Sequence, residues 1–397
     1  MDINKTPNAD RLHIGIFGKR NAGKSSLINA LTGQNSALVS QVAGTTTDPV
    51  YKAMEVMGVG ACVFIDTAGF DDNDNLLGDL RLQKTNDVLQ KTDIAIMIFC
   101  DENIEYEIEW IEKFNEKNIP IIPVINKADI LTYSGRLAQI IIDKTKLEPL
   151  FVSSINSTGI KELLSEISKK IPTEFQTETI TGHLVSENDV VMLVMPQDSQ
   201  APKGRLILPQ VQTIRDLLNF ECTVICTTLI SMQQSLSVLK QPPKLIICDS
   251  QVFQNVYEIA PNESKLTSFS VLFAKYKGDL DEFIKGANAI DNLNENSTIL
   301  IAEACTHSPL SEDIGRVKIP NLLRKKVGEN INIEFVSGVD FPTNLSKYDL
   351  VIHCGGCMFN KKYIMSRIEI AKNCNVPITN YGILIAKMKN ILEKITF

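Results

Sequence analysis

The first part of the chain alternates short, almost fully apolar runs with longer segments in which apolar residues recur every three or four positions. The apolar runs are Leu12–Phe17, Ala61–Ile65, Ile94–Cys100, Ile121–Ile125 and Phe151–Ser153. The segments with helical spacing include Ser25–Thr32, Glu105–Lys117 and Ile160–Lys170. This alternation is typical of buried parallel strands joined by helices. It predicts a doubly wound α/β domain, followed by a linker at Pro172 and Thr173–Thr181.

Two further αβ sets follow. In the second set we predict strands at Val190–Met195, Thr223–Thr227 and Lys244–Cys248, helices at Pro209–Leu218 and Ser231–Leu239, and a β-like run at Lys265–Phe273. In the third set we predict strands at Thr298–Ala302, Asn332–Val336 and Leu350–Ile352, and helices at Asp281–Ala289, Ile319–Val327, Lys361–Asn373 and Gly382–Lys394. The pattern therefore predicts an α/β protein of three αβ domains, at residues 1–172, 180–273 and 277–397. The second is small, and its exposed sheet edges favour pairing with another copy.

Composition narrows the class of protein. With 397 residues, 44% of them hydrophobic and 22% charged, the chain is ordinary for a globular protein and too long for one core. A net charge of −7 argues against nucleic acid as a partner. No apolar run reaches the roughly 20 residues of a membrane span, and the N-terminus lacks the apolar segment of a secretory signal. We expect a cytoplasmic protein whose nine cysteines are reduced thiols or metal ligands.

The motif Gly18-Lys-Arg-Asn-Ala-Gly-Lys-Ser25 matches G-x-x-x-x-G-K-S between a predicted strand and a predicted helix. Gly18 and Gly23 would let the backbone wrap phosphate, with N–H groups pointing inward at a helix N-terminus. Lys24 would neutralise the β- and γ-phosphates, and the Ser25 hydroxyl would bind Mg²⁺. The predicted nucleotide-binding residues of this loop are Gly18, Asn21, Ala22, Gly23, Lys24, Ser25 and Ser26.

Three later stretches complete a predicted GTP site. Asp66-Thr-Ala-Gly69 would place a carboxylate near Mg²⁺ and a glycine near the γ-phosphate. In Asn126-Lys127-Ala-Asp129, Asp129 can accept hydrogen bonds from the guanine N1–H and 2-amino group, which selects GTP over ATP. Ser153 and Ser154 occupy the remaining guanine-supporting loop. The residues predicted to act in hydrolysis are Lys24, Thr46, Asp66, Gly69 and Asp79.

The order and spacing of these motifs resemble the translation-factor-like GTPases, in particular the group of the tRNA-modification and ribosome-assembly GTPases, over residues 11–171. The resemblance implies that Asn21 and Thr45 bind K⁺ beside the phosphates and that Thr46 reaches Mg²⁺. Phe70 stands where many small GTPases carry the glutamine that orients water, so we expect slow hydrolysis that needs another group or K⁺. Asp79 belongs to an acidic run that offers candidates, although most of that run is interpreted as a solvated loop.

A second kind of chemistry is predicted near the C-terminus. Cys305-Thr-His307 follows one predicted strand, and His353-Cys354-Gly-Gly-Cys357 follows another, so their thiols would meet at the carboxyl edge of a parallel sheet. These thiolates and imidazoles could bind a tetrahedral zinc ion, or three irons of a [4Fe–4S] cluster with the fourth iron open. The spacing alone leaves both metals possible. The other cysteines, Cys62, Cys100, Cys222, Cys226, Cys248 and Cys374, are interpreted as structural, mostly as apolar packing.

The arrangement C-x-H…H-C-x-x-C downstream of a GTPase resembles the [FeFe]-hydrogenase maturation GTPases (the HydF family) over the whole chain. The resemblance implies a middle domain that forms a homodimer and a last domain that binds a [4Fe–4S] cluster through Cys305, Cys354 and Cys357. His307 and His353 would either bind iron or shape the pocket. Such a protein carries a diiron precursor bearing CO and cyanide to apo-[FeFe]-hydrogenase, alongside two radical-SAM hydrogenase maturases. The alternative hypothesis is a K⁺-dependent GTPase of RNA modification or ribosome assembly with a zinc-binding C-terminal domain.

Overall fold

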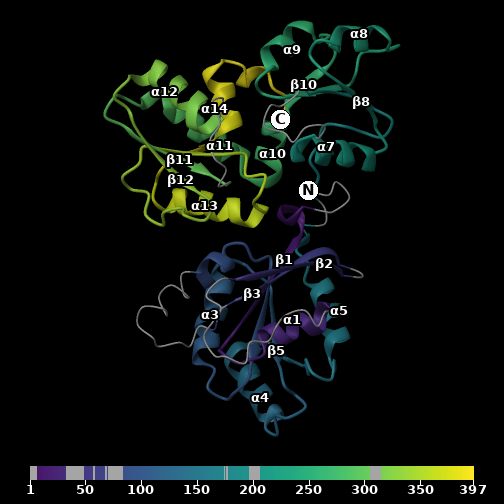
Figure 1. The fold of residues 1–397 in the computed structure, drawn as a ribbon, viewed down its shortest axis with the longest axis vertical. Helices are drawn as coiled ribbons and strands as arrows, with labels where there is room; N and C mark the ends of the chain where they lie inside the picture. Colours follow the sequence, from purple (N-terminus) through teal and green to yellow (C-terminus); the bar gives the residue numbers. More distant parts are fainter. Residues whose placement is uncertain are drawn as a thin grey trace. The chain divides into compact units, whose positions relative to one another are not determined.

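A computed structural model describes residues 7–32, 49–56, 59–67, 69, 84–173, 175, 178–195, 206–304 and 314–397. The chain divides into two units, Met1–Thr177 and Glu178–Phe397, which are treated separately below (Figure 1). In these ranges, the first unit holds one β-sheet and the second holds two. Within the described ranges, no helix combines the length and apolar character needed to cross a membrane.

The sheet of the first unit has the strand order β2-β3-β1-β4-β5-β6. Its strands are β1 (Leu12–Gly18), β2 (Val50–Val56), β3 (Gly60–Asp66), β4 (Ile94–Phe99), β5 (Ile121–Ile125) and β6 (Leu150–Phe151). The predicted parallel core is confirmed, because every neighbouring pair is parallel except β2 and β3. Strand β2 escaped prediction because it is an edge strand with most of its residues exposed or half-buried, so it carries no continuous apolar run.

Helices cover both faces of this sheet (Figure 1). Helices α1 (Lys24–Thr32) and α5 (Ile160–Lys169) pack on one face, where Leu27 and Leu163 join the core. Helices α3 (Glu105–Glu116) and α4 (Ser134–Thr145) pack on the other. There Phe17 stacks on Trp110 with ring centroids 5.7 Å apart. This is the doubly wound layering that the sequence predicts.

The first sheet of the second unit has the order β10-β9-β7-β8 and is entirely parallel. Its strands are β7 (Val190–Val194), β8 (Thr223–Thr227), β9 (Leu245–Cys248) and β10 (Lys265–Ser268), with helices α7 (Leu208–Asn219), α8 (Met232–Ser237) and α9 (Phe253–Ile259). Strand β8 lies at an edge. The prediction that Cys226 packs in the core is wrong, because the residue is exposed on this edge strand.

The predicted β-run Lys265–Phe273 is also wrong beyond its first half. Strand β10 ends at Ser268, and helix α10 (Phe269–Lys277) begins directly after it. The Ser268 hydroxyl accepts a hydrogen bond from the Val271 N–H, which is the contact expected of a helix N-cap. Because α10 is buried on most of its surface, its sequence shows no polar face that would have marked it as a helix.

The second sheet of this unit has the order β12-β11-β13-β14 and is also parallel. Its strands are β11 (Thr298–Glu303), β12 (Asn332–Ser337), β13 (Leu350–His353) and β14 (Ile378–Asn380). Its helices are α11 (Leu280–Asn288), α12 (Ile319–Val327), α13 (Lys361–Asn373) and α14 (Tyr381–Met388). The predicted helix Gly382–Lys394 stops early, since α14 ends at Met388 and a short 3-10 helix, η4 (Leu392–Lys394), follows.

The two sheets of the second unit share a hydrophobic core. Val271 and Ala274 of α10 belong to the same buried cluster as Phe283 of α11, Tyr363 of α13 and Ile383 of α14. The predicted boundary between residues 273 and 277 falls inside α10, so this helix joins the two sheets rather than ending one of them. The limits of the three predicted domains stay predictions.

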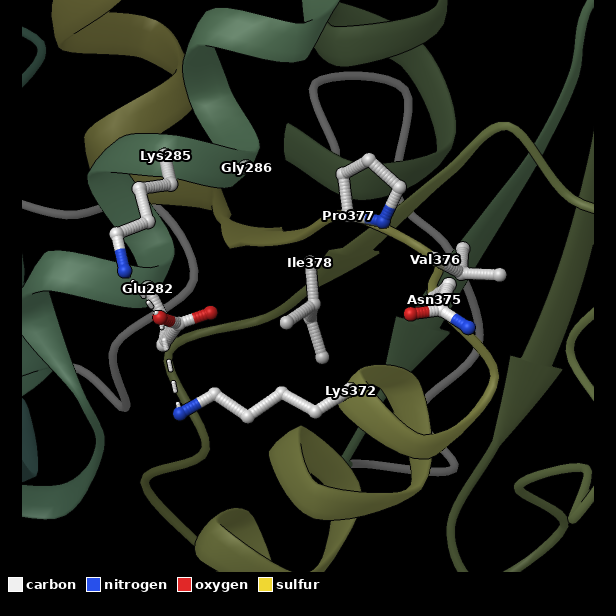
Figure 2. A pocket seen from close by; sticks show the side chains of 8 residues that line it. All are labelled: Glu282, Lys285, Gly286, Lys372, Asn375, Val376, Pro377 and Ile378. Carbon is white, nitrogen blue, oxygen red and sulfur yellow. Dashed lines mark hydrogen bonds and ion pairs between the residues drawn. The ribbon is translucent and has the colours of Figure 1, made fainter.

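A pocket lies at the amino edge of the β12-β11-β13-β14 sheet, beside Ile378, the first residue of β14 (Figure 2). Its charged lining is already engaged in ion pairs, since Lys372 Nζ lies 3.7 Å from a Glu282 oxygen and Lys285 Nζ lies 2.6 Å from the same atom. Cys354 directly follows the last residue of β13, so it lies at the opposite, carboxyl edge of the sheet. We therefore place the candidate chemistry away from this pocket.

Candidate functional site

The glycine-rich loop between β1 and α1 wraps around a buried lysine. Lys24 Nζ donates hydrogen bonds to the carbonyl oxygens of Gly18, at 2.8 Å, and Lys19, at 2.7 Å. Gly23 has φ +90°, and a Cβ at that position would stand 2.3 Å from Asn126 Nδ2. Both observations on Gly23 explain why only glycine fits, because a side chain would be strained and would collide. The loop has the curvature that a phosphate cradle needs.

Asp66, the last residue of β3, lies beside the start of α1. The Ser25 hydroxyl donates to Asp66 Oδ2 at 2.5 Å. The other oxygen, Asp66 Oδ1, is buried and has no hydrogen-bond partner among the described residues. Burial raises the pKa of Asp66, although the Ser25 hydrogen bond and the Lys24 charge act in the opposite direction. A buried carboxylate oxygen without a donor, next to a serine hydroxyl, fits a divalent cation such as Mg²⁺.

Gly69 lies directly against the loop. A Cβ on Gly69 would stand 2.7 Å from the Arg20 backbone nitrogen and 2.8 Å from the Arg20 Cα. Backbone atoms cannot yield as a flexible side chain can, so any larger residue here would push this segment away from the loop. The segment after β3 therefore approaches the loop only because residue 69 is glycine.

The guanine-supporting segments predicted from the sequence meet the loop from its other side. Asn126 Nδ2 donates to the carbonyl oxygens of Ala22, at 3.1 Å, and Gly23, at 3.3 Å. The Ser154 hydroxyl donates to Asn126 Oδ1 at 2.9 Å. Asn126 thus ties together motifs that lie far apart in the chain.

Two neighbours of Asn126 complete this corner. Lys127 Nζ donates to the Asn21 carbonyl oxygen at 2.7 Å. Ser153 is buried, and its hydroxyl accepts from the Asn156 N–H at 3.2 Å. Asp129 is exposed, so its carboxylate is open to a ligand from solvent. Ser26 is half-buried in the first turn of α1.

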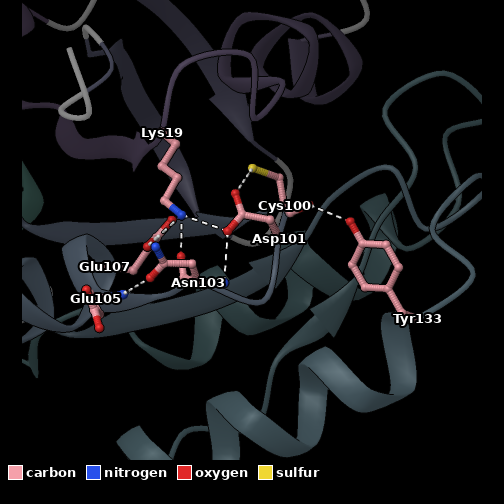
Figure 3. A network of polar contacts seen from close by, with 7 residues as sticks. All are labelled: Lys19, Cys100, Asp101, Asn103, Glu105, Glu107 and Tyr133. Atoms are coloured by element: carbon pink, nitrogen blue, oxygen red, sulfur yellow. Dashed lines mark hydrogen bonds and ion pairs between the residues drawn. The ribbon is translucent and has the colours of Figure 1, made fainter. Parts of the chain in front are cut away.

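Lys19, inside the glycine-rich loop, anchors it through a network that the sequence analysis missed (Figure 3). Its Nζ donates to Asp101 Oδ1 at 2.7 Å and to the Asn103 carbonyl, and lies 3.8 Å from Glu107 Oε2. Burial alone would lower the pKa of Lys19, but the Asp101 hydrogen bond and the Glu107 charge outweigh it and raise that pKa. The acidic cluster that begins α3, just after β4, is the signal in the sequence for this contact.

A thiol lies at the carboxyl edge of the last sheet, as predicted. Strands β11 and β13 are parallel neighbours with Ala302 opposite His353, and Cys354 comes next. Cys354 Sγ accepts hydrogen bonds from the N–H groups of Ala304, at 3.0 Å, and Gly356, at 3.4 Å. Burial raises the pKa of the Cys354 thiol to about 11. N–H donors aimed at a sulfur are typical of thiolates that bind metal clusters.

Cys357 lies on the same loop, one tight turn later. Gly356 has φ +62°, and a Cβ there would stand 2.4 Å from Ile364 Cδ1, so the turn favours glycine. Lys277 anchors the loop, because its Nζ donates to the carbonyl oxygens of Cys357, at 3.4 Å, and Phe359, at 3.1 Å. Lys277 is the last residue of α10 and is itself buried.

His353 is buried with both ring nitrogens engaged. Nδ1 lies 2.6 Å from the Cys354 carbonyl oxygen, and Nε2 lies 2.8 Å from Arg367 Nη1. Burial and, to a smaller extent, the positive charge of Arg367 lower the pKa of His353 to about 3, so the ring is neutral. Nδ1–H then donates to the carbonyl and Nε2 accepts from the guanidinium. This arrangement favours His353 as a residue that shapes the pocket over His353 as a metal ligand.

Several predicted site residues lie outside the described residues, namely Thr45, Thr46, Asp79, Cys305 and His307. Cys305 directly follows Ala304, whose N–H donates to Cys354 Sγ. In the part of the chain that the structure describes, no three histidine, cysteine or acidic side chains gather as a metal site. Cys354 and Cys357 would need a third ligand, and the donor set of two thiols with N–H groups on sulfur fits a sulfur-ligated metal.

Three family models match the chain. The model described as "50S ribosome-binding GTPase" matches residues 13–127. The "Hydrogen maturase F dimerization domain" matches residues 180–278, and the "Hydrogen maturase F tetramerization domain" matches residues 281–396. The last two together cover more than half of the 397 residues.

Curated relatives match a smaller part of the chain. The tRNA modification GTPase MnmE of Endomicrobium trichonymphae is 35% identical over 187 residues, which cover 46% of this chain and 38% of the relative. The GTPase Der of Wolinella succinogenes is 38% identical over 139 residues, which cover 32% of this chain and 28% of the relative. The chain thus spans well under half the length of these two relatives.

Among solved structures, a variant of Era from Aquifex aeolicus bound to GDP and aluminium fluoride is 18% identical. The match covers 64% of this chain and 98% of that one, with a TM-score of 0.37. A likeness at this level adds nothing to the fold already described.

Proposed function

Because the chain belongs to the hydrogen maturase F family, we propose that it is a GTP-hydrolysing scaffold and carrier in [FeFe]-hydrogenase maturation. In this proposal it binds a [4Fe–4S] cluster and passes a diiron CO/cyanide precursor, as cargo, to apo-[FeFe]-hydrogenase. The observation that carries the proposal is Cys354 Sγ, which accepts two backbone N–H groups at the carboxyl edge of the last sheet. A cysteine that served only as apolar packing would not need two N–H donors directed at its sulfur.

The nucleotide half of the proposal assigns roles to residues of the first unit. Lys24 and the loop N–H groups hold the phosphates of GTP, while Ser25, Asp66 and Thr46 bind Mg²⁺. Asp129 recognises guanine, and Asn126 supports it through the Ala22 and Gly23 carbonyls. The buried Asp66 Oδ1, which has no donor among the described residues, supports the metal assignment.

Hydrolysis is proposed to be slow and stimulated by K⁺ at Asn21 and Thr45, with Gly69 near the γ-phosphate and Asp79 as the candidate acidic group. GTP then sets the timing of partner association, because segments ordered around the γ-phosphate relax after hydrolysis. The partners in this proposal are apo-[FeFe]-hydrogenase and the two radical-SAM hydrogenase maturases. No product of GTP turnover enters the cluster chemistry.

The metal half assigns the cluster thiolates to Cys305, Cys354 and Cys357, which leaves one iron open. His307, two residues after Cys305, is the candidate for that iron, and His353 shapes the pocket through Arg367. When bound, the cluster would supply an anionic inorganic centre. The chain's own loop supplies N–H groups to the Cys354 sulfur.

The proposal also includes a homodimer. The matched family models are described as dimerization and tetramerization domains. In the first sheet of the second unit, β8 is an edge strand with exposed or half-buried residues, so its free backbone groups can pair with another chain.

Anaerobic purification of the full chain, followed by iron and sulfide reconstitution, tests this function. We expect a brown protein with a cubane signal in electron paramagnetic resonance after reduction, and loss of that signal in Cys305→Ala. A colourless protein that holds one zinc ion and binds tRNA would instead support the alternative, a K⁺-dependent GTPase of RNA modification or ribosome assembly.

A further inference from the structure

Arg367 is a buried cation that has no acidic partner among the residues the structure describes. It lies on α13 and is 1% exposed. Its hydrogen-bond partners are all neutral groups: Nη1 meets His353 Nε2 at 2.8 Å, while Nη2 donates to the Gly338 carbonyl at 2.5 Å and to the Tyr363 hydroxyl at 3.4 Å. Its Nε has no hydrogen-bond partner within the described ranges. No carboxylate in these ranges forms an ion pair with it.

Three aromatic rings surround the guanidinium. Its carbon lies 4.7 Å from the ring centroids of Phe341 and Tyr363 and 4.6 Å from that of Phe359. Aromatic faces attract a cation, but the attraction of each ring is weaker than the penalty for burying an unpaired charge. Among the described residues, these neutral contacts therefore leave most of the positive charge without a counter-charge.

A counter-charge would lie at the carboxyl edge of the last sheet, where the loop with Cys354 and Cys357 begins; we call this the sulfur edge. His353, which Arg367 contacts, directly precedes Cys354 in the chain. Phe359, which covers the guanidinium, is two residues after Cys357, and its carbonyl is held by Lys277. The His353 and Phe359 rings lie side by side, with centroids 6.2 Å apart, so the guanidinium is enclosed by the two ends of the loop that carries the thiols.

We propose that Arg367 is the built-in counter-charge of the bound cluster and makes the cluster easier to reduce. The inference rests on the proposed iron–sulfur function and deepens it. Reduction adds one electron from an external low-potential donor and takes the cluster from the 2+ to the 1+ state, with no bond broken. Because the centre becomes more negative, a fixed positive charge nearby stabilises the reduced form more than the oxidised form. Arg367 acts as a positioning residue, because it hydrogen-bonds His353, the neighbour of the proposed ligand Cys354.

A purely structural role makes a different prediction. If Arg367 served only to fill space between the three rings, a neutral side chain of similar length would leave the reduction potential unchanged once the protein had folded. The reduction potential of the cluster therefore distinguishes a role of the Arg367 charge from a role in packing.

The test is a redox titration of the reconstituted full chain with dithionite, followed by electron paramagnetic resonance. Arg367→Gln keeps a donor for His353 but removes the charge, and Arg367→Lys keeps the charge. We expect the potential of Arg367→Gln to move to a more negative value, with iron and sulfide content near wild type, and that of Arg367→Lys to stay close to wild type. The matched control is Lys372→Met, because Lys372 lies on the same helix but pairs with Asp279 near the surface.

An unchanged potential in an iron-loaded Arg367→Gln protein would overturn the proposal. Arg367→Met is the second neutral variant, and circular dichroism reports whether each variant folds. If both neutral variants unfold while Arg367→Lys folds, Arg367 belongs to the fold and the proposal is equally wrong. A wild-type chain that takes up no iron refutes the proposed function itself, and this is seen before any variant is compared.

Discussion

Two sheet edges can be compared as ligand sites. One is the carboxyl edge of the sheet in the first unit, and the other is the carboxyl edge of the last sheet in the second unit. In the proposed function, both edges hold an anionic ligand at the ends of parallel strands. At the first edge, side chains from separate motifs bind one another, as Asn126 binds Ala22, Gly23 and Ser154. At the second edge, backbone N–H groups point at Cys354 Sγ and a charged residue is buried behind it.

This difference suggests how long each ligand stays. The nucleotide edge keeps Asp129 exposed and Asp66 Oδ1 without a donor among the described residues, so its contacts are completed by a ligand that comes and goes. At the edge that carries Cys354, the Arg367 guanidinium is buried, and the proposed negative cluster would offset the cost of that burial for as long as it stays bound. The first edge suits an exchanging nucleotide, and the second suits a cofactor that remains through many nucleotide cycles.

The largest difference between the two edges is expected when one proposed cluster thiol is removed. Cys354→Ala should abolish the iron–sulfur absorbance and leave GTP binding at the wild-type level, because the two edges share no residue. Iron analysis and nucleotide titration measure the two effects. Cys226→Ala is the matched control, since Cys226 is an exposed thiol on β8. Retention of a full cluster in Cys354→Ala would contradict the assignment of this edge.

The converse change removes guanine recognition. Asp129→Asn should weaken GTP binding by roughly 100-fold or more, because two hydrogen bonds to a charged acceptor are lost, each contributing about 1.5–3 kcal/mol. The same variant should prefer xanthine nucleotides, whose base presents a carbonyl in place of the 2-amino group. Asp143→Asn, on the exposed face of α4, is the control. Unchanged GTP affinity in Asp129→Asn would show that guanine is read elsewhere.

Loss of the Lys19 network should destabilise the first unit without touching the cluster. Lys19→Met leaves the buried Glu107 carboxylate without this cation, and should cost about 2 kcal/mol, less than a fully buried pair because Asp101 is 44% exposed. Urea unfolding of the full chain measures it, with the exposed Lys144→Met as control. An equal loss in the two variants would mean that the network adds nothing to stability.

The contribution of the Lys19 network to stability should depend on pH in the direction set by the upward shift of the Lys19 pKa. The pKa of Lys19 is raised above its ordinary value of 10.5, so its contribution is fully present below 10.5 and is lost as pH rises through the higher folded value. The stability difference between wild type and Lys19→Met should therefore stay constant from neutral pH up to the approach to 10.5. A difference that disappears within this range would mean that another group carries it.

The smallest expected effect concerns the helix that joins the two sheets of the second unit. Ser268→Ala removes the hydroxyl that accepts from the Val271 N–H and should cost about 1 kcal/mol of stability in that unit. The thermal unfolding transition of the second unit measures this loss of stability. Ser237→Ala is the control, because its hydroxyl bonds only within an exposed turn of α8. Equal losses in both variants would rule out a special role for the cap.

The sequence predicted most of the parallel strands because each is a continuous apolar run, and it predicted the nucleotide motifs because each is contiguous. It failed where burial removed the periodic signal, as in α10, and where exposure removed the apolar run, as in β2. It also missed Lys19 and Arg367. Their partners lie far away in the chain, or are neutral, so no local pattern marks them.

Lys277 has a practical consequence for anyone who divides this chain. It is the last residue of a helix that belongs to the core beneath the β10-β9-β7-β8 sheet, yet its ammonium group holds the loop that contains Cys357. The dimerization model ends at residue 278 and the tetramerization model begins at residue 281. A fragment that starts after residue 278 would lack the hydrogen bonds of Lys277 to this loop and part of the shared core. Such a fragment should load iron poorly even with Cys305, Cys354 and Cys357 all present, whereas one that begins before β7 should load it normally.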